Sequence, residues 1–146
     1  MKIVAENKRA RFDYELLGIY EAGIVLTGDE IKSVRLGHFS IVDCYGFIKD
    51  GECFLRNSYI KEYSNSFDAG RFGDTTRRDR KLLLHKEEIL KIKKKLETEH
   101  LTLVPTKSYF DGSNLKVEIA VARGKKLYDK RETLKKKDIE KKLRNL

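Results

Sequence analysis

The sequence predicts a mainly β protein with appended helices: a small, closed or nearly closed antiparallel β-barrel followed by a basic C-terminal tail. Three observations indicate this. Several short strand-like segments are separated by hairpin turns, two segments have helical signatures, and the last residues are lysine-rich with few apolar side chains. We therefore expect one barrel over residues 1–122 and a tail over residues 123–146, within the size range of a single domain.

The positive charge is concentrated at the C-terminal end. The chain has 32 Lys and Arg against 23 Asp and Glu, a net charge of +9. Residues 123–146 contain eleven Lys or Arg and four Asp or Glu, so they carry +7 of this. A nearly neutral body with a strongly basic end is typical of a protein that docks on nucleic acid. The sequence shows neither a signal peptide nor an apolar span of ~20 residues, so we expect a cytoplasmic protein without a membrane segment.

The first third of the chain contains one clear helix start. Residues 1–12 are polar and basic, and we expect them to be frayed or to extend an RNA-facing patch. Residues 14–26 are expected to form one or two strands, bent at Gly18 or Gly23. Thr27 and Glu30 have the spacing of a capping box, so a short helix is expected to begin there and to end at Gly37.

The middle of the chain contains the strongest hairpin signal. Asp50-Gly51 separates two apolar runs, residues 45–49 and 52–56, and both turn positions need positive φ. Residues 58–63 are a further strand candidate. Residues 64–80 have little periodicity and are expected to form a long functional loop. The end of this loop is dense in positive charge.

The next segments alternate between helix and strand patterns. Residues 86–99 have apolar side chains at helical spacing, and the lysines on the other faces are expected to be solvated. Residues 101–110 are strand-like, with Pro105 indicating an edge or a bulge. Residues 115–122 alternate cleanly, which points Lys116 and Glu118 outward.

No catalytic or metal-binding pattern stands out. The sequence lacks nucleotide-loop and serine-nucleophile motifs, so we expect no catalytic residues and no cofactor. The three histidines are scattered and no C-x-x-C pair is present, so no metal site is expected. Cys44 and Cys53 flank the predicted hairpin turn, where they could face each other. In a reducing cytosol they are expected to act as small apolar packing residues.

The positive signals concern binding. Basic and aromatic residues interleave at residues 107–110 and 125–130, a combination that can neutralise phosphates and stack on bases. Tyr128 either stacks on a base or folds back onto the barrel, and local chemistry favours neither. Residues beyond Lys130 have too narrow an apolar stripe for a stable free helix, so we expect them to be disordered when free and ordered on a polyanion.

Several short stretches, in order along nearly the whole chain, resemble the small protein B (SmpB) family. They are residues 7–10 (NKRA), 21–28 (EAGIVLTG), 30–33 (EIKS), 80–86 (RKLLLHK), 115–119 (LKVEI) and 124–131 (GKKLYDKR). The resemblance implies an OB-fold-like barrel and a non-enzymatic role. Members of this family bind the tRNA-like domain of tmRNA and deliver it, with elongation factor Tu, to stalled bacterial ribosomes for trans-translation, which tags the peptide and rescues the ribosome. We expect this chain to act as a monomer.

The resemblance also implies site residues. Those expected to bind tmRNA are Asn7, Lys8, Arg9, Glu21, Arg78, Arg80, Lys81, Leu83 and Lys116. The family's tail enters the vacant mRNA channel of the small ribosomal subunit, becomes helical and reads the decoding site through its RNA contacts. The matching residues here are Gly124, Lys125, Lys126, Tyr128, Asp129, Lys130 and Arg131.

Two departures from the family pattern are visible. Thr75-Thr76 stands where the family usually has Asp-Pro, and Phe12 stands where it often has His. The sequence leaves two other function classes as alternatives to the adaptor: a generic nucleic-acid-binding barrel, which would prefer unpaired RNA, and an enzyme, which would need a cluster of ionisable groups in a cleft.

Overall fold

The computed structural model describes residues 2–64, 71 and 73–125 of the chain. Its elements, in chain order, are β1 (Lys2–Glu6), α1 (Ala10–Asp13), β2 (Tyr14–Ile24), α2 (Gly28–Arg35), β3 (Phe39–Ser40), β4 (Tyr45–Lys49), β5 (Glu52–Arg56), β6 (Tyr59–Ile60), β7 (Arg80–Leu83), α3 (Lys86–Thr98), β8 (Thr102–Asp111) and β9 (Asn114–Gly124). The protein is thus mainly antiparallel β with a few helices, as predicted.

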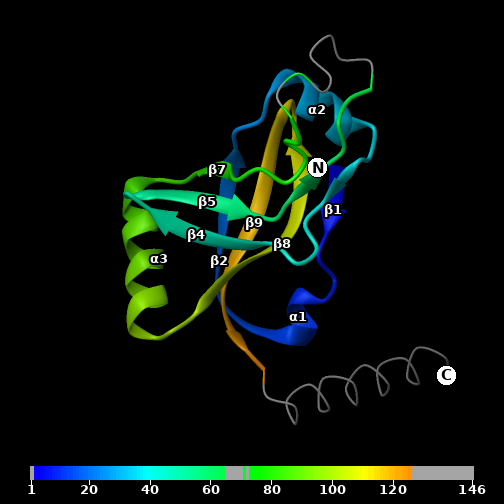
Figure 1. Ribbon diagram of the computed structural model, residues 1–146. Helices are drawn as coiled ribbons and strands as arrows, with labels where there is room; N and C mark the ends of the chain where they lie inside the picture. Colours follow the sequence, from blue (N-terminus) through cyan, green and yellow to red (C-terminus); the bar gives the residue numbers. More distant parts are fainter. Residues whose placement is uncertain (1, 65–70, 72, 126–146) are drawn as a thin grey trace, which may run out of the picture.

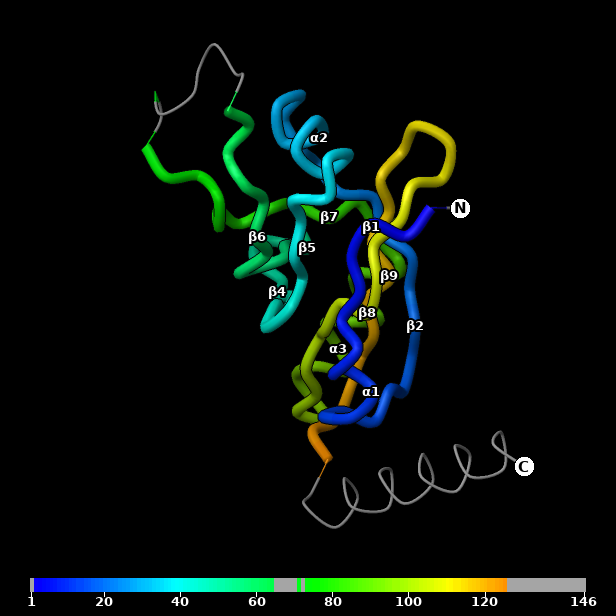
Figure 2. The backbone as a smooth tube through the Cα atoms, turned by 90° about the vertical axis from the view of Figure 1, so that its right-hand side faces the viewer, coloured from blue at the N-terminus to red at the C-terminus, as the bar shows by residue number. Residues whose placement is uncertain are grey.

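The main sheet closes on itself. Its seven strands run in the order β1-β8-β4-β5-β7-β2-β9, and β9 pairs again with β8 along almost its whole length. Ring closure reduces the open sheet edges that would otherwise need covering, although β1, among the described strands, pairs only with β8. In Figures 1 and 2, α2 lies at one end of this ring, while α1 lies at the other end, beside the last residues of β9.

One long strand makes the closure possible. β8 pairs with β9 along one edge, and along the other edge it pairs first with β4, at Leu103, and then with β1, from Lys107 onward. The register shifts between Pro105 and Lys107. This irregularity confirms the bulge that Pro105 predicted.

The core lies inside the ring and under the helices. Leu55, Leu103, Ile119 and Val121 are almost completely buried, and Ile92 of α3 closes the core from one side. Outside the ring, Ala120 and Ala122 are also buried, because they pack with Val104 under Tyr14 and Leu16. The outward face of β9 is therefore accessible only over its first half.

Local sequence signals predicted a helix start and a hairpin turn correctly. Thr27 Oγ1 accepts a hydrogen bond from the Glu30 amide at 3.2 Å, and the Glu30 carboxylate accepts one from the Thr27 amide at 3.0 Å, so the capping box is present. Gly37 has φ of +85° just after α2. Asp50 and Gly51 have φ of +52° and +75° between β4 and β5, as the hairpin requires.

Two expectations about elements were wrong. Residues 2–6 are not frayed, because they pair with β8 as β1. The strand expected at residues 58–63 is only the two-residue β6, which pairs with β3 in a separate small sheet. The loop expected over residues 64–80 has neither helix nor strand in its described residues up to Asp79, and Arg80 begins β7, which joins β5 to β2. Residues 65–70 and 72 lie outside the described part.

Both cysteines are free and buried. Burial raises the pKa of the Cys44 thiol to about 12 and that of Cys53 to about 11, so neither thiol ionises readily near neutral pH. The interpretation as packing residues is confirmed.

Candidate nucleic-acid interface

Three of the expected site residues converge on the outer surface of the ring. Gly23 of β2 is the direct partner of Leu83 on β7 and of Lys116 on β9. Direct partners in antiparallel strands point to the same side of a sheet. Leu83 is 53% exposed although it is apolar, and Lys116 is half-buried. A side chain at position 23 would meet Leu83, since a Cβ there would lie 3.3 Å from the Leu83 Cβ. Glycine at this position leaves room for Leu83.

Glu21 lies on the same surface, two residues before Gly23 in β2. Its carboxylate accepts a hydrogen bond from the Tyr109 hydroxyl of β8, and Tyr109 is the cross-strand partner of Lys116. Burial, together with the Glu21 carboxylate, raises the pKa of Tyr109 to about 12. We call Glu21, Leu83, Tyr109 and Lys116 the outer-face cluster.

A second carboxylate faces Glu21. Glu118 of β9 is its direct partner, and two like charges at such a pair repel each other. Each carboxylate has its own donor, however. Thr106 Oγ1 donates to Glu118 at 2.5 Å, and Lys107 is the direct partner of Glu118 on β8. The surface therefore presents anchored carboxylate acceptors next to lysine side chains, an arrangement suited to reading base and sugar groups as well as phosphates.

Arg80 does not lie where the expected contact with tmRNA would need it. Its side chain has no exposed surface. Its guanidinium donates to Glu30 Oε2 at 2.7 and 3.0 Å, and to the carbonyl and hydroxyl of Ser58 at 2.8 and 2.9 Å. Arg80 therefore ties α2 to the segment that precedes β7, and a phosphate cannot reach it in this structure.

Arg78 and Lys81 are only partly available. Arg78 also binds the Glu30 carboxylate, and about a third of its side chain is exposed. Lys81 donates to Glu52 at 3.0 Å from a half-exposed position. Both side chains can still approach an RNA backbone, but an RNA phosphate would compete with the carboxylate that each of them already binds.

The N-terminal turn, which we define as residues 7–13 and which includes α1, lies between the outer surface and the start of the tail. The Asn7 amides donate to the carbonyls of Thr106 and Pro105, at 2.8 and 3.2 Å, while Lys8 and Arg9 are exposed. Arg9 pairs with Asp13 at 3.5 Å. Asn7, Lys8, Lys107 and Glu118 are among the residues that line a cavity of about 420 Å³.

The first residues of the expected tail are held by this turn. Gly124 ends β9 opposite Tyr14, and Lys125 donates to the carbonyls of Asp13 and Arg11, both at 2.9 Å. Lys126, Tyr128, Asp129, Lys130 and Arg131 lie outside the described residues.

Sequence reasoning missed two participants. Tyr109 and Glu30 were not named as site residues, although Tyr109 lies in the basic and aromatic stretch at residues 107–110. Its role depends on the pairing of β8, β9 and β2, which a single sequence does not reveal. Glu30 was recognised only as half of a capping box.

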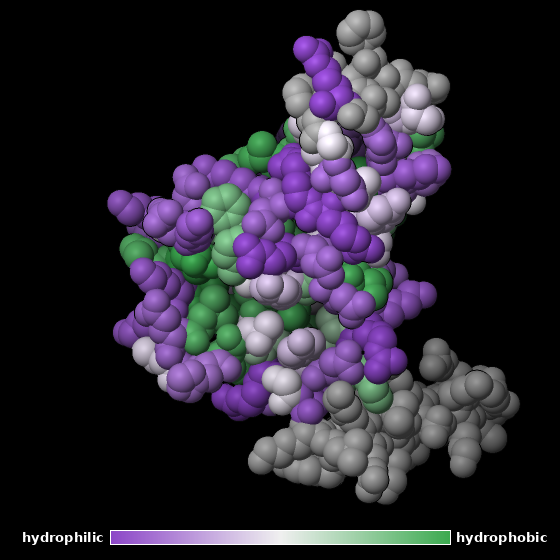
Figure 3. All heavy atoms as spheres, viewed as in Figure 1, coloured by the Kyte–Doolittle hydropathy of each residue, from purple (hydrophilic) through white to green (hydrophobic). Residues whose placement is uncertain are grey.

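On the surface drawn in Figure 3, hydrophilic side chains predominate, and hydrophobic ones gather beside α3.

Comparison with known proteins decides the family. The model of the SmpB protein family matches residues 4–146. The chain belongs to the SmpB family. Among curated relatives of this SmpB protein, the SsrA-binding protein of Sulfurihydrogenibium sp. is 49% identical over 142 residues, covering 97% of this chain and 91% of that protein. The SsrA-binding protein of Mesorhizobium japonicum is 51% identical over 138 residues, covering 94% and 85%.

A solved structure agrees with this membership. It is described as "tmRNA-SmpB: a journey to the center of the bacterial ribosome". One of its chains matches this SmpB protein with a TM-score of 0.67 and 46% sequence identity, and the match covers 84% of each chain. Sequence and fold therefore point to the same family.

Proposed function

We propose that this SmpB protein is an RNA-binding adaptor that binds the tRNA-like domain of tmRNA and brings it to stalled bacterial ribosomes for trans-translation. The relatives named above carry the name SsrA-binding protein, and the similar solved structure concerns tmRNA, SmpB and the bacterial ribosome. The protein acts by binding and catalyses no bond change itself. It acts on the ribosome, and therefore in the cytoplasm.

The observation that carries the proposal is the outer-face cluster. Glu21, Leu83 and Lys116 belong to three different strands, and the sheet register brings them together around Gly23. An exposed leucine beside a lysine and an anchored carboxylate offers a stacking surface, a phosphate contact and a hydrogen-bond acceptor. This combination can recognise a folded RNA by shape and functional groups rather than by charge alone.

The tail has a separate task in this proposal. Lys125 and Gly124 begin it beside the N-terminal turn, where the exposed Lys8 and Arg9 add positive charge. We assign the tail, with Tyr128, Asp129, Lys130 and Arg131, to small-subunit RNA near the vacant decoding site and mRNA channel. The protein enters as a monomer in a delivery complex with tmRNA and elongation factor Tu.

The test is a mobility-shift titration of the full-length protein with the tRNA-like domain. Lys116→Ala, Leu83→Ala and Glu21→Gln are each expected to weaken binding about tenfold, or about 1.4 kcal/mol. Lys91→Ala removes an equal charge from the exposed side of α3 and should bind like the wild type. Wild-type affinity in all three cluster variants would reject this surface. A preference for unpaired RNA of equal length would instead favour a generic nucleic-acid-binding barrel.

A further inference from the structure

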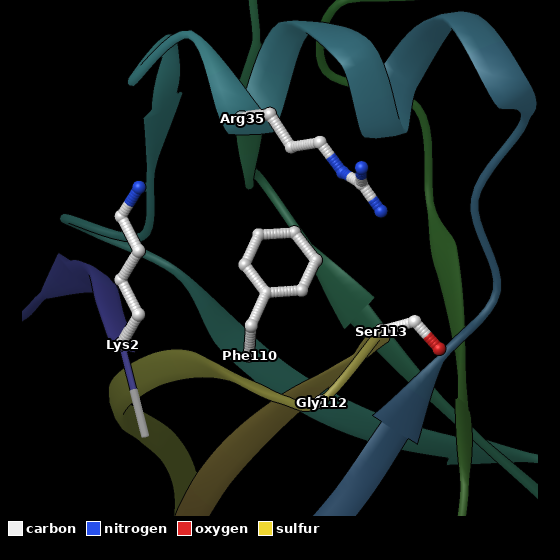
Figure 4. Close-up of a pocket in the computed structure, with 5 residues that line it drawn as sticks. All are labelled: Lys2, Arg35, Phe110, Gly112 and Ser113. Atoms are coloured by element: carbon white, nitrogen blue, oxygen red, sulfur yellow. The ribbon is translucent and has the colours of Figure 1, made fainter.

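A second cavity opens where α2 meets the turn between β8 and β9. It has a volume of about 580 Å³ and is lined by Lys2, Arg35, Phe110, Gly112 and Ser113. This volume is within the range of roughly 300–1,000 Å³ that is usual for small-ligand sites. In Figure 4, the side chains of Lys2 and Arg35, which come from β1 and α2, flank the ring of Phe110. None of these residues belongs to the outer-face cluster.

The pairing of β1 and β8 fixes the floor of this cavity. Lys2 is the direct partner of Phe110, and the Phe110 ring is half-buried at the edge of the core. Arg35, in the last turn of α2, holds its guanidinium 5.5 Å from the centre of that ring. Gly112 has φ of +60° in the turn, and a Cβ at this position would meet nothing within 4 Å. The backbone of the turn is therefore open to a ligand.

The charges of the cavity favour an anion that carries a ring. The Arg35 guanidinium stands over the Phe110 ring and Lys2 lines the same cavity, and no carboxylate is among the described residues that line it. Asp111 is the nearest acid in sequence, and strand alternation points it to the opposite side of β8, where it influences Tyr109. Lysine and arginine neutralise phosphate, while an aromatic ring stacks on an unpaired base.

The cavity is close to the outer-face cluster along β8, but it lies on the other face of that strand. The pair Lys2–Phe110 comes directly after the pair Ile3–Tyr109, and Tyr109 is itself the partner of Lys116, so alternation points Phe110 and Tyr109 to opposite faces. An RNA strand that contacts Lys116 would reach the cavity by bending over the β8–β9 turn. We propose that this cavity binds one unpaired nucleotide of the bound RNA, with its base against Phe110 and its phosphate between Lys2 and Arg35. The proposal rests on the function proposed above.

Two readouts test this subsite. In mobility-shift titrations with the tRNA-like domain, Arg35→Gln should weaken binding roughly fivefold and lower the slope of log affinity against log salt by about 1. Phe110→Leu keeps an apolar side chain but removes the ring, and should weaken binding roughly fivefold with an unchanged salt slope. Lys91→Gln, on the exposed face of α3, is the matched control and should leave affinity unchanged.

The second readout uses a five-nucleotide single-stranded RNA, titrated into isotope-labelled full-length protein. The amide signals of Gly112 and Ser113 should shift with this probe and should respond much less in Phe110→Leu. Absent shifts in the wild type, or wild-type binding by both variants, would overturn the proposal. So would equal shifts with inorganic phosphate alone, since the ring would then contribute nothing. Arg35 is exposed, so its variant is expected to fold even if Phe110→Leu does not.

The two proposals fail in distinguishable ways. If the wild type does not bind the tRNA-like domain at all, the proposed function is wrong. The titration with the short RNA still shows whether the cavity binds an unpaired nucleotide. If the wild type binds and only the cavity variants behave like the control, the adaptor function stands and the subsite is rejected.

Discussion

Glu30 shares one carboxylate among three donors: the Thr27 amide, Arg78 and Arg80. Burial alone would raise its pKa, but the hydrogen bonds from Arg78, Thr27 and Arg80 outweigh burial, so the pKa of Glu30 lies below its ordinary value. Burial also lowers the pKa of Arg80, against the opposing influence of Glu30. Its guanidinium nevertheless stays protonated, because arginine titrates far above neutral pH. The ion pair is therefore intact at neutral pH.

This lowered pKa gives a pH-dependent stability. The ionised Glu30 contributes fully above its unfolded pKa of about 4.3, and the contribution is lost as the pH falls through the lower folded value. Glu30→Gln should reduce the free energy of unfolding by about 3 kcal/mol at pH 7, because it leaves the buried Arg80 without its counter-charge. Urea unfolding at pH 7 and pH 3 should show this difference shrinking in acid. Glu87→Gln, on the exposed first turn of α3, should change little, and a difference that persists undiminished at pH 3 would contradict the account.

Tyr109 positions Glu21 within the outer-face cluster. Tyr109→Phe keeps the buried ring but removes the hydroxyl that donates to Glu21. We expect a loss of about 1 kcal/mol in the free energy of unfolding. We also expect a roughly threefold weaker affinity for the tRNA-like domain, since Glu21 is then free to rotate. Calorimetry and mobility shifts on the same preparation measure both. If Glu21→Gln weakens RNA binding while Tyr109→Phe leaves it unchanged, the hydroxyl does not position the carboxylate.

The roles of single residues were predictable only where strand alternation or the family resemblance indicated them. Alternation along β9 placed Lys116 outside, and the family resemblance supplied Glu21 and Leu83. The burial of Arg80 could not be foreseen, because an arginine-rich stretch is typical of a surface and its partner Glu30 lies 50 residues earlier. Tyr109 likewise depends on a pairing across three strands.

At the scale of elements, caps and turns were predictable because their signals are local. The capping box at Thr27 and the Asp50-Gly51 turn are each defined within four residues, and both are present. β1 was missed for the opposite reason. Its five residues carry little pattern, and they become a strand because β8 offers an unpaired edge beyond the bulge at Pro105. Nothing near residue 2 encodes that edge.

The joint between β4 and β8 is tightly packed. Gly46 is paired with Leu103, and a Cβ at Gly46 would lie 2.5 Å from Leu103 Cδ2 and 2.8 Å from its Cγ. Leu103 is only 1% exposed, so it is packed on all sides by other residues. Gly46→Ala should therefore lower the free energy of unfolding by about 2 kcal/mol through overpacking. Gly28→Ala is the control, since its Cβ would meet nothing within 4 Å, and equal stabilities in urea would show that the joint can relax.

For the whole molecule, the question is which part holds tmRNA and which part serves the ribosome. β9 runs to Gly124, two residues past the boundary expected at Ala122, and Lys125 is bound to the carbonyls of Asp13 and Arg11. A truncation that spares the barrel should thus end after Lys125. It removes nine Lys or Arg and four Asp or Glu, which is +5 of the net +9.

If tmRNA binding were mainly phosphate attraction, this truncation would collapse the affinity and flatten its salt dependence, because each phosphate contact on a duplex contributes about −0.9 to the slope. The outer-face cluster and the cavity at Phe110 both lie within residues 2–125, so we expect the truncated protein to bind tmRNA within about tenfold of full length. It should fail to support peptide tagging on stalled ribosomes.

Alanine replacement of Asp129, Lys130 and Arg131 should impair tagging more than replacement of Lys135, Lys136 and Lys137. The first three directly follow Tyr128, whereas the other three are charges that nearby lysines can replace. Paired gel-shift and tagging assays decide this. Normal tagging by the truncated protein, or complete loss of its tmRNA binding, would show that barrel and tail do not divide the work in this way.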